Sequence, residues 1–339
     1  MRSAVRLGLA AIWGTAAISA IAADAPRFPI MGTTASFRFS GNAAAVAAAE
    51  RAAHREFDRI SECCNLHDPK SELSRLNASA AKAPFACSET LYAVLREARR
   101  AWVESEGAFD ITAKPLMDLW GFYRKRAAEP SPAEIAAALA SVGLEKVEFD
   151  DAAKTVRFTR SGMAFDLGGI AKGAAVDRAF AAASLRLDGL LIDLGGNLRM
   201  RAPAAGRAFR IGIRDPFGGT APVRAEECRE GAFSTSGGYE RFVTYGGVRY
   251  AHIIDPRTGR PGQGRLAVTV ISDRGAEEAD WMSTAVFLRG RELAEKLHRL
   301  HPKCRFILFE YGIRPGEYRR IVIGGSSASP AEARDQRLE

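Results

Sequence analysis

The chain lacks the short motifs that most readily assign a function. Its five cysteines include no C-x-x-C pair, so neither a zinc site nor a thioredoxin-like redox site is expected. The glycine-rich fingerprints of dinucleotide-binding and P-loop proteins are absent, and so is the G-x-S-x-G motif of serine hydrolases. The sequence also contains no internal repeat and no low-complexity linker.

Basic residues exceed acidic residues, but they form no stripe with aromatic residues between them. The net charge of +8 can assist an anionic ligand or an acidic partner, although a solvated surface is the simpler explanation. Without the aromatic-interleaved stripe, nucleic-acid binding is not expected. An apolar content of 47% and a charged content of 26% over 339 residues indicate a soluble globular protein with a substantial core.

Only the N-terminus has a long apolar run. Arg2 and Arg6 precede an apolar segment over residues 7–22, which ends in the small-residue sequence Ala-Ile-Ala. This pattern predicts a signal peptide over residues 1–22, without a lipid-anchor cysteine and without a membrane span after cleavage. Removing the two arginines lowers the net charge from +8 to +6. We therefore expect a periplasmic protein, in which four of the five cysteines can pair in a way the sequence does not specify.

Apolar periodicity predicts an α+β fold of mixed or antiparallel sheets with packed helices. Helices are expected over residues 42–60, 88–103, 132–142, 169–183 and 276–288, with Asn42, Ser88 and Ser131 as caps of the first three. Strands are expected over residues 190–194, 209–213, 241–245, 248–254 and 266–272, and hairpins over 146–159 and 305–323. We expect one catalytic domain over residues 23–325, a small inserted lobe over 121–160 and a loose tail over 326–339.

Asp280 and Thr284 are candidate metal ligands. They stand one helical turn apart, so their oxygens face the same way, and Ser283 lies beside them. Carboxylate and hydroxyl oxygens suit Mg²⁺. The alternative is an aspartate at a helix start and a threonine facing solvent.

Three further segments carry residues suited to chemistry on a phosphate. Gly168 and Gly169 precede a helix, where backbone N–H groups attract anions and Lys172 can reach a phosphate, although tight helix packing also explains the glycines. Ser236 lies in what reads as a glycine turn, where its hydroxyl can hold a loop or a ligand. His252 ends an apolar strand and is a candidate base or a structural histidine. Asp255 can orient that imidazole or cap the following turn.

Taken together, eight ordered blocks resemble the FAD:protein FMN transferase family, also called ApbE. The blocks are Met31-Gly32-Thr33, Ser71 to Asn77, Gly107 to Asp110, Leu119 to Phe122, Asp166 to Gly173, Thr235 to Gly237, His252 to Pro261 and Asp280 to Thr284. The resemblance implies a T-fold-like architecture. It also implies Mg²⁺-dependent transfer of the FMN moiety of FAD to a threonine or serine hydroxyl of a target redox protein, with release of AMP.

The resemblance further implies a role for particular residues. Mg²⁺ would be held by Asp280, Thr284 and the Ala171 carbonyl, with Ser283 as a further ligand, and His252 would be the base. The expected FAD contacts are Met31, Ala108, Phe109, Asp110, Asp166, Lys172 and Ile254, and His67 occupies the place of an aromatic residue that stacks on the flavin. Two alternatives remain open: an FAD pyrophosphatase that yields FMN and AMP, and a periplasmic protein that binds FAD without turnover.

Overall fold

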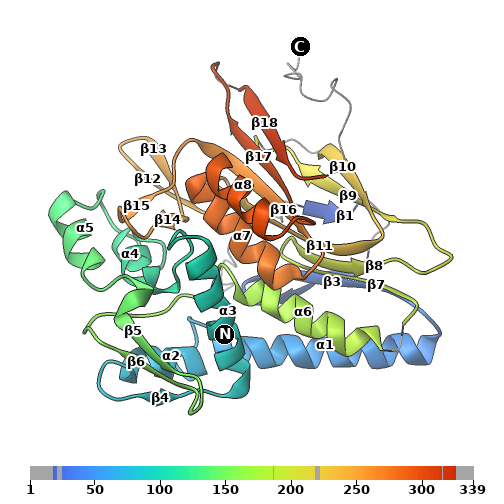
Figure 1. Ribbon diagram of the computed structural model, residues 1–339, viewed down its shortest axis with the longest axis horizontal. Coiled ribbons are helices and arrows are strands. Elements are labelled where there is room, and N and C mark those ends of the chain that lie inside the picture. Colours follow the sequence, from blue (N-terminus) through green and yellow to red (C-terminus); the bar gives the residue numbers. More distant parts are fainter. Residues whose placement is uncertain (1–17, 21–24, 186, 218–221, 315, 326–339) are drawn as a thin grey trace, which may run out of the picture.

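A large antiparallel sheet forms the centre of the computed structural model, which describes residues 18–20, 25–185, 187–217, 222–314 and 316–325 (Figure 1). Its eight strands follow the order β18-β17-β16-β11-β8-β7-β3-β2. They are β2 (Phe28–Ile30), β3 (Thr33–Ser40), β7 (Gly189–Leu194), β8 (Asn197–Arg201), β11 (Glu230–Gly237), β16 (Arg265–Ser272), β17 (Arg305–Tyr311) and β18 (Tyr318–Ile323).

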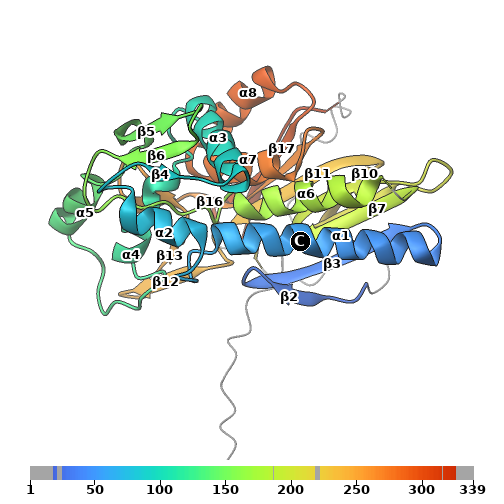
Figure 2. The same cartoon turned by 90° about the horizontal axis from the view of Figure 1, so that it is seen from below.

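Helices cover one face of this sheet and a smaller sheet covers the other. The described helices are α1 (Ala43–Cys64), α2 (Glu72–Ser79), α3 (Glu89–Glu104), α4 (Lys114–Leu119), α5 (Pro132–Leu139), α6 (Ala171–Ser184), α7 (Ala276–Arg289) and α8 (Arg291–Leu300), with 3₁₀ turns η1 (Ile111–Ala113) and η2 (Leu144–Lys146). α6 and α7 lie against the large sheet, and α1 runs beside α6 (Figures 1 and 2). The opposite face packs on β9 (Phe209–Arg214) and β10 (Pro222–Cys228), and β1 (Ile18–Ala20) pairs with β9 in the same small sheet.

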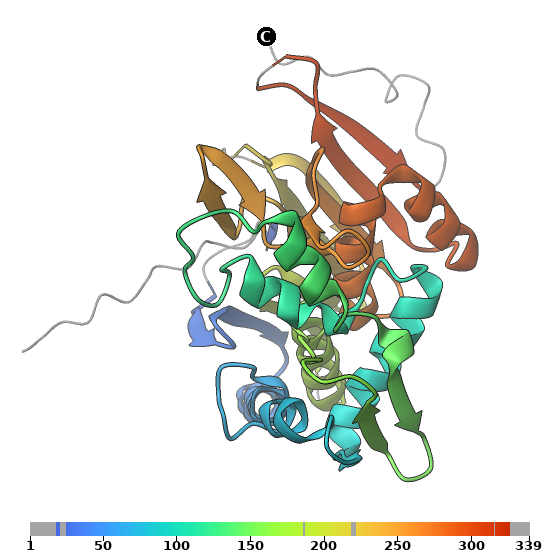
Figure 3. The same ribbon diagram turned by 90° about the vertical axis from the view of Figure 1, so that its left-hand side faces the viewer.

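The remaining strands form small sheets at one end of the molecule. They are β4 (Phe85–Ala86), β5 (Val147–Asp150) and β6 (Thr155–Phe158) in one sheet, and the pairs β12 (Phe242–Tyr245) with β13 (Val248–Ala251) and β14 (Ile254–Asp255) with β15 (Arg260–Pro261). Figure 3 views this end directly, with the green helices α4 and α5 facing the reader. The predicted lobe over residues 121–160 contains α5, η2, β5 and β6. Its boundaries stay a prediction, as β6 also pairs with β4.

Helix α1 follows the predicted amphipathic pattern. Ala49, Ala53, Phe57 and Ile60 are buried on one side, at spacings of three and four residues. The Asn42 side chain accepts a hydrogen bond from the Ala45 backbone N–H at 2.9 Å and caps the helix. The predicted caps of α3 and α5 are confirmed as well, because Ser88 and Ser131 accept from the first turns of these helices.

The crossing of α6 and α7 depends on Gly173. A Cβ atom at this position would lie 2.4 Å from the backbone oxygen of Ala276 and 2.5 Å from the Cα of Glu277. Asp177, one turn further along α6, accepts hydrogen bonds from the backbone N–H groups of Ala276 at 2.8 Å and Glu277 at 3.0 Å. The two contacts fix the start of α7 against α6, and therefore fix where Asp280 lies.

Two local predictions are wrong. The predicted strand over residues 248–254 breaks at His252 and Ile253, which lie in a bend between β13 and β14. Ser236 lies within strand β11 rather than in a glycine turn, since β11 pairs with β16 through Gly237. At Ser236 the serine and glycine residues suggested a turn, but pairing of β11 with β16 determines the backbone conformation.

Some sequence predictions fall outside the described residues. These are most of the signal peptide and the whole tail over residues 326–339. Residues 18–20 of the predicted signal peptide are described as β1, so cleavage after residue 22 would leave β9 paired with β10 alone. Among the described residues, no helix has the length and apolar character needed to cross a membrane. All five cysteines are described and none forms a disulfide.

Candidate active site

The predicted site residues meet at one cavity of about 510 Å³. Its walls come from segments that are far apart in the chain, from β2–β3 at one extreme to α7 at the other. Among the predicted residues, the walls include Met31, His67, Ala108, Phe109, Asp110, Asp166, Ala171, Lys172, His252, Ile254, Asp280 and Thr284. Ser283 is the exception, because it lies fully buried behind the wall.

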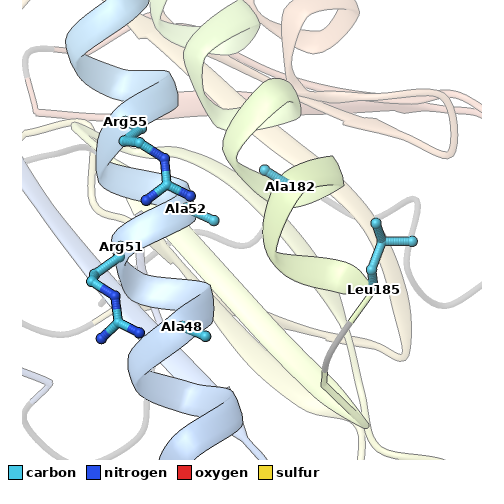
Figure 4. A pocket seen from close by; sticks show the side chains of 6 residues that line it. All are labelled: Ala48, Arg51, Ala52, Arg55, Ala182 and Leu185. Atoms are coloured by element: carbon cyan, nitrogen blue, oxygen red, sulfur yellow. The ribbon is translucent and has the colours of Figure 1, made fainter.

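A second hollow lies between α1 and α6, away from these residues (Figure 4). It has a volume of about 390 Å³ and is lined by Arg51 and Arg55 together with small or apolar side chains. None of its lining residues is a carboxylate or a nucleophile. We therefore place the chemistry in the larger cavity.

Asp280 and Lys172 form the charged end of the larger cavity. Asp280 is 4% exposed, and its carboxylate accepts a hydrogen bond from the Gly173 backbone N–H at 3.1 Å. The Lys172 ammonium lies 3.7 Å from the same carboxylate oxygen and donates to the Gly168 carbonyl at 2.7 Å. Burial raises the pKa of Asp280, while the Lys172 charge and the Gly173 N–H oppose that rise.

Hydroxyl groups gather next to Asp280. The Ser236 hydroxyl lies 2.8 Å from that of Ser283 and 3.2 Å from that of Thr284, so β11 and α7 contribute to one polar cluster. Gly169 keeps this part of the cavity open. A Cβ atom there would lie 3.0 Å from the Phe109 ring and 3.4 Å from the Thr284 hydroxyl oxygen.

The chemistry of this donor set fits Mg²⁺. A buried carboxylate, nearby hydroxyls and the Ala171 backbone at the cavity wall offer only oxygen ligands, which is the preference of this ion. The described residues contain no group of three or more His, Cys, Asp or Glu side chains suited to a metal. A site here would therefore combine one carboxylate with hydroxyl and backbone oxygens, and would be completed by water or substrate.

His252 is held as a neutral imidazole with a defined tautomer. Its Nδ1 lies 3.2 Å from the Arg241 carbonyl oxygen, which can only accept, so Nδ1 carries the proton and Nε2 is left as the basic nitrogen. Burial, with the positive charges of Arg241 and Lys172, lowers the pKa of His252 to about 4. Asp255 does not orient this ring. It accepts from the Arg257 backbone N–H at 2.9 Å and pairs with the Arg257 guanidinium, so it caps the turn.

Asp110 and Asp166 organise the walls of the cavity. The Asp110 carboxylate accepts from Thr112 and, at 3.0 Å, from the Leu144 N–H, which fixes the loop that carries Ala108 and Phe109. The Asp166 carboxylate accepts from the Gly168 N–H at 2.9 Å and from the Tyr123 hydroxyl. The side chains of Asp110 and Asp166 also line the cavity, so each can hold the wall in place and contact a ligand.

Among the cavity residues absent from the predicted site, three affect its geometry: Ser236, Arg241 and Tyr123. Ser236 belonged to one of the eight ordered blocks, and its place in strand β11 brings its hydroxyl to 3.2 Å from that of Thr284. Arg241 supplies the carbonyl that fixes the His252 tautomer, a backbone role that no side-chain pattern reveals. Tyr123 directly follows the Leu119–Phe122 block, and only tertiary structure places it beside His67.

Comparisons with known proteins find relatives that match most of the chain. The FAD:protein FMN transferase of Treponema pallidum is 37% identical over 249 residues, covering 68% of this chain and 68% of that protein. The Vibrio cholerae FAD:protein FMN transferase is 32% identical over 273 residues, covering 78% of this chain and 80% of that protein.

Solved structures show the same fold. The crystal structure of the ApbE protein from Thermotoga maritima has a TM-score of 0.77 at 30% identity, covering 84% of this chain and 93% of that one. The flavin transferase ApbE from Vibrio cholerae has a TM-score of 0.76 at 27% identity, covering 88% and 96%. Residues 31–308 match the ApbE family, and this chain belongs to that family.

Proposed function

We propose that this protein transfers the FMN moiety of FAD to a threonine or serine hydroxyl of a target redox protein. In this reaction the acceptor oxygen bonds to the FMN phosphorus, and the bond from that phosphorus to the oxygen shared with AMP breaks. The electron pair of the broken bond leaves with AMP, and the proton of the acceptor hydroxyl passes to the enzyme. The product is a phosphoester-linked flavin.

The single observation that carries this proposal is the tautomer and protonation state of the His252 imidazole. A neutral hydroxyl attacks phosphorus poorly and needs a base near its proton. With Nδ1 donating to the Arg241 carbonyl at 3.2 Å, Nε2 is the free basic nitrogen at the cavity wall. A lowered pKa of about 4 keeps this nitrogen unprotonated at neutral pH. His252 therefore takes the acceptor proton.

Lys172 and Asp280 position the diphosphate end of FAD. The Lys172 ammonium, 3.7 Å from the Asp280 carboxylate, provides positive charge where phosphate oxygens would lie. Asp280, Thr284 and the Ala171 carbonyl would hold Mg²⁺, which neutralises developing charge on phosphate oxygens when bound, while Ser283 lies behind the wall with its hydroxyl 2.8 Å from that of Ser236. The Thr284 hydroxyl lies 3.2 Å from that of Ser236, so the serine restrains its orientation.

The rest of the cavity suits the remainder of FAD. Met31, Ala108, Phe109 and Ile254 provide apolar wall, and a volume of about 510 Å³ accommodates part of a dinucleotide with the remainder at the opening. We further propose that residues 1–22 are removed on export and that the enzyme acts in the periplasm on an exported or membrane-bound acceptor.

Intact-mass analysis tests the proposal directly. The mature chain is incubated with FAD, Mg²⁺ and a candidate redox protein that carries an exposed threonine. We expect the acceptor to gain the mass of FMN and AMP to appear in equal amount. Intact FAD after incubation, with Mg²⁺ binding verified separately, would contradict the proposal and favour a binding protein without turnover.

Hydrolysis is the competing reaction because water can replace the acceptor hydroxyl at the same residues. In that case FMN and AMP form while the acceptor mass stays unchanged. A second acceptor in which the threonine is replaced by valine distinguishes the outcomes. Transfer requires the hydroxyl and stops with this acceptor, whereas hydrolysis continues at the same rate.

A further inference from the structure

Two surface segments border the part of the cavity that holds His252. The first is the loop over residues 121–129, in which the centroid of the Phe122 ring lies 6.5 Å from that of the His252 ring. The second is the β12–β13 hairpin, which ends immediately before this histidine. The Tyr245 hydroxyl of the hairpin donates to the Trp120 carbonyl at 2.7 Å, so the hairpin and the start of the loop are held together at one end of the molecule (Figure 3).

The hairpin presents one face to solvent. Side chains alternate along its strands, and Val243, Tyr245 and Tyr250 pack on the apolar cluster around α4 and α5. Phe242 and Arg249 lie on the opposite face, where both are exposed and the guanidinium carbon lies 4.6 Å from the centroid of the phenyl ring. Within the described part of the chain, β12 and β13 pair only with each other. The hairpin therefore offers an apolar ring, a cation and outer strand edges to a partner.

Positive charge predominates on these two segments. Residues 121–129 and 240–251 together contain five basic and two acidic residues, which gives a net charge of +3. Arg124 and Lys125 are exposed, and neither side chain has a hydrogen bond or an ion pair with any residue that the structure describes. Unpaired cations beside a reaction site attract an anionic partner and slow its dissociation less than they speed its approach. The charge therefore indicates an acidic partner at this edge of the cavity.

We propose that an acidic, extended segment of the acceptor protein docks across the loop over residues 121–129 and the β12–β13 hairpin, and so brings its hydroxyl to Nε2 of His252. Its carboxylates pair with Arg124, Lys125 and Arg249, and its backbone follows an outer edge of the hairpin toward the histidine. This inference rests on the proposed function, because it assumes that a protein hydroxyl is the acceptor.

A protein segment fits this surface better than a membrane does. Binding in a membrane interface needs a broad apolar face, usually along a helix, that enters the lipid. The exposed face of the hairpin has one large apolar side chain, Phe242, which is 41% exposed. A single ring beside separate cations instead suits a chain that alternates acidic and apolar side chains.

Peptide binding to the full mature protein, with FAD and Mg²⁺ present, tests this assignment. The probe is a synthetic peptide with a red fluorescent label, in which glutamates flank a valine that replaces the acceptor threonine, so no transfer occurs. Its anisotropy should rise with the wild type, and a peptide with glutamines in place of the glutamates should bind at least about tenfold more weakly. Affinity for the acidic peptide should fall about tenfold in Arg124→Glu/Lys125→Glu and about threefold in Arg249→Glu. FAD affinity should stay within about twofold in both variants, which also verifies that they fold.

Arg51→Glu/Arg55→Glu is the matched control, because it reverses the same charge at two exposed arginines beside the hollow between α1 and α6. It should leave peptide affinity nearly unchanged. An equal loss in this control would overturn the docking surface, and so would equal binding of the glutamine peptide or a loss from only one of the two segments. Phosphatidylglycerol vesicles that bind through the same residues, with no binding of the acidic peptide, would overturn it in favour of a membrane. Failure of the proposed function is distinguishable, as the wild type would then bind the peptide in this manner and yet modify no acceptor.

Discussion

The Nδ1 of His252 donates to the backbone carbonyl of Arg241 at 3.2 Å, at the junction between β13 and β14. This bond determines which ring nitrogen is free, and it predicts a specific result for His252→Ala. Transfer should fall by about 10² to 10⁴, the usual contribution of a general base. FAD affinity should stay within a few-fold, because the charged end of the cavity is unchanged. Single-turnover transfer rates and FAD titration measure the two effects separately.

A matched control for this substitution is His54→Ala, since His54 lies on α1 and does not line the cavity. It should leave the transfer rate unchanged. A His252→Ala enzyme that transfers at the wild-type rate would show that another group, or none, takes the proton.

The lowered pKa of His252 predicts the pH dependence of the free enzyme. Because its pKa is about 4 in the folded protein and 6.5 as the ordinary value, the acid limb of kcat/KM should lie near pH 4 rather than near 6.5. The same difference means that His252 binds a proton more readily in the unfolded chain. Its contribution to stability is therefore complete above about pH 6.5 and is lost as the pH falls toward 4. An acid limb near 6.5 would contradict the buried, neutral imidazole.

Asp280→Asn tests the proposed metal site. The amide keeps the size of the side chain but removes the charge, so Mg²⁺ should bind far more weakly and Mg²⁺-dependent transfer should fall by at least 10². Isothermal titration with Mg²⁺ in the presence of ADP measures binding without requiring turnover. Asp58→Asn on the exposed side of α1 is the control and should bind Mg²⁺ normally. Unchanged Mg²⁺ binding in Asp280→Asn would remove this residue from the site.

We expect Gly173→Ala to lower the free energy of unfolding, whereas the same change in an exposed helix usually raises it. In an open helix position, replacing glycine by alanine stabilises the helix by about 1 kcal/mol. Here the added Cβ would lie 2.4 Å from the Ala276 carbonyl oxygen, so overpacking should instead destabilise the protein by about 1–3 kcal/mol or more. Denaturant unfolding measures the free energy. Ala181→Gly, at an exposed position of α6, should cost only about 1 kcal/mol. Increased stability of Gly173→Ala would contradict the tight crossing.

The α+β class was predictable because the helices keep a clear amphipathic period, as the buried positions of α1 illustrate. The short ordered blocks of the sequence identified residues that line one cavity in the structure, including Asp280 and Thr284, which are one helical turn apart. Strand β11 could not be predicted from local sequence patterns. Its Ser234 to Gly237 segment has turn-forming residues, and only pairing with β16 makes it extended.

Contacts between distant segments could not be predicted from the sequence either. Nothing near Tyr123 in the chain indicates that it meets His67, because the two residues are 56 positions apart (123 − 67). The role of Arg241 depends on its backbone carbonyl, which every residue has. Such features follow from how the small sheets dock on the main body, and that docking is a tertiary property.

The cavity walls extend from Met31 to Leu288, so segments far apart in the chain contribute to one binding surface. Ligand binding and cooperative unfolding are therefore thermodynamically linked across the whole domain. FAD at about 100 times its Kd would add about 2.7 kcal/mol to the global free energy of unfolding. Occupancy by the substrate then protects the elements at both ends of the domain against local opening and proteolysis.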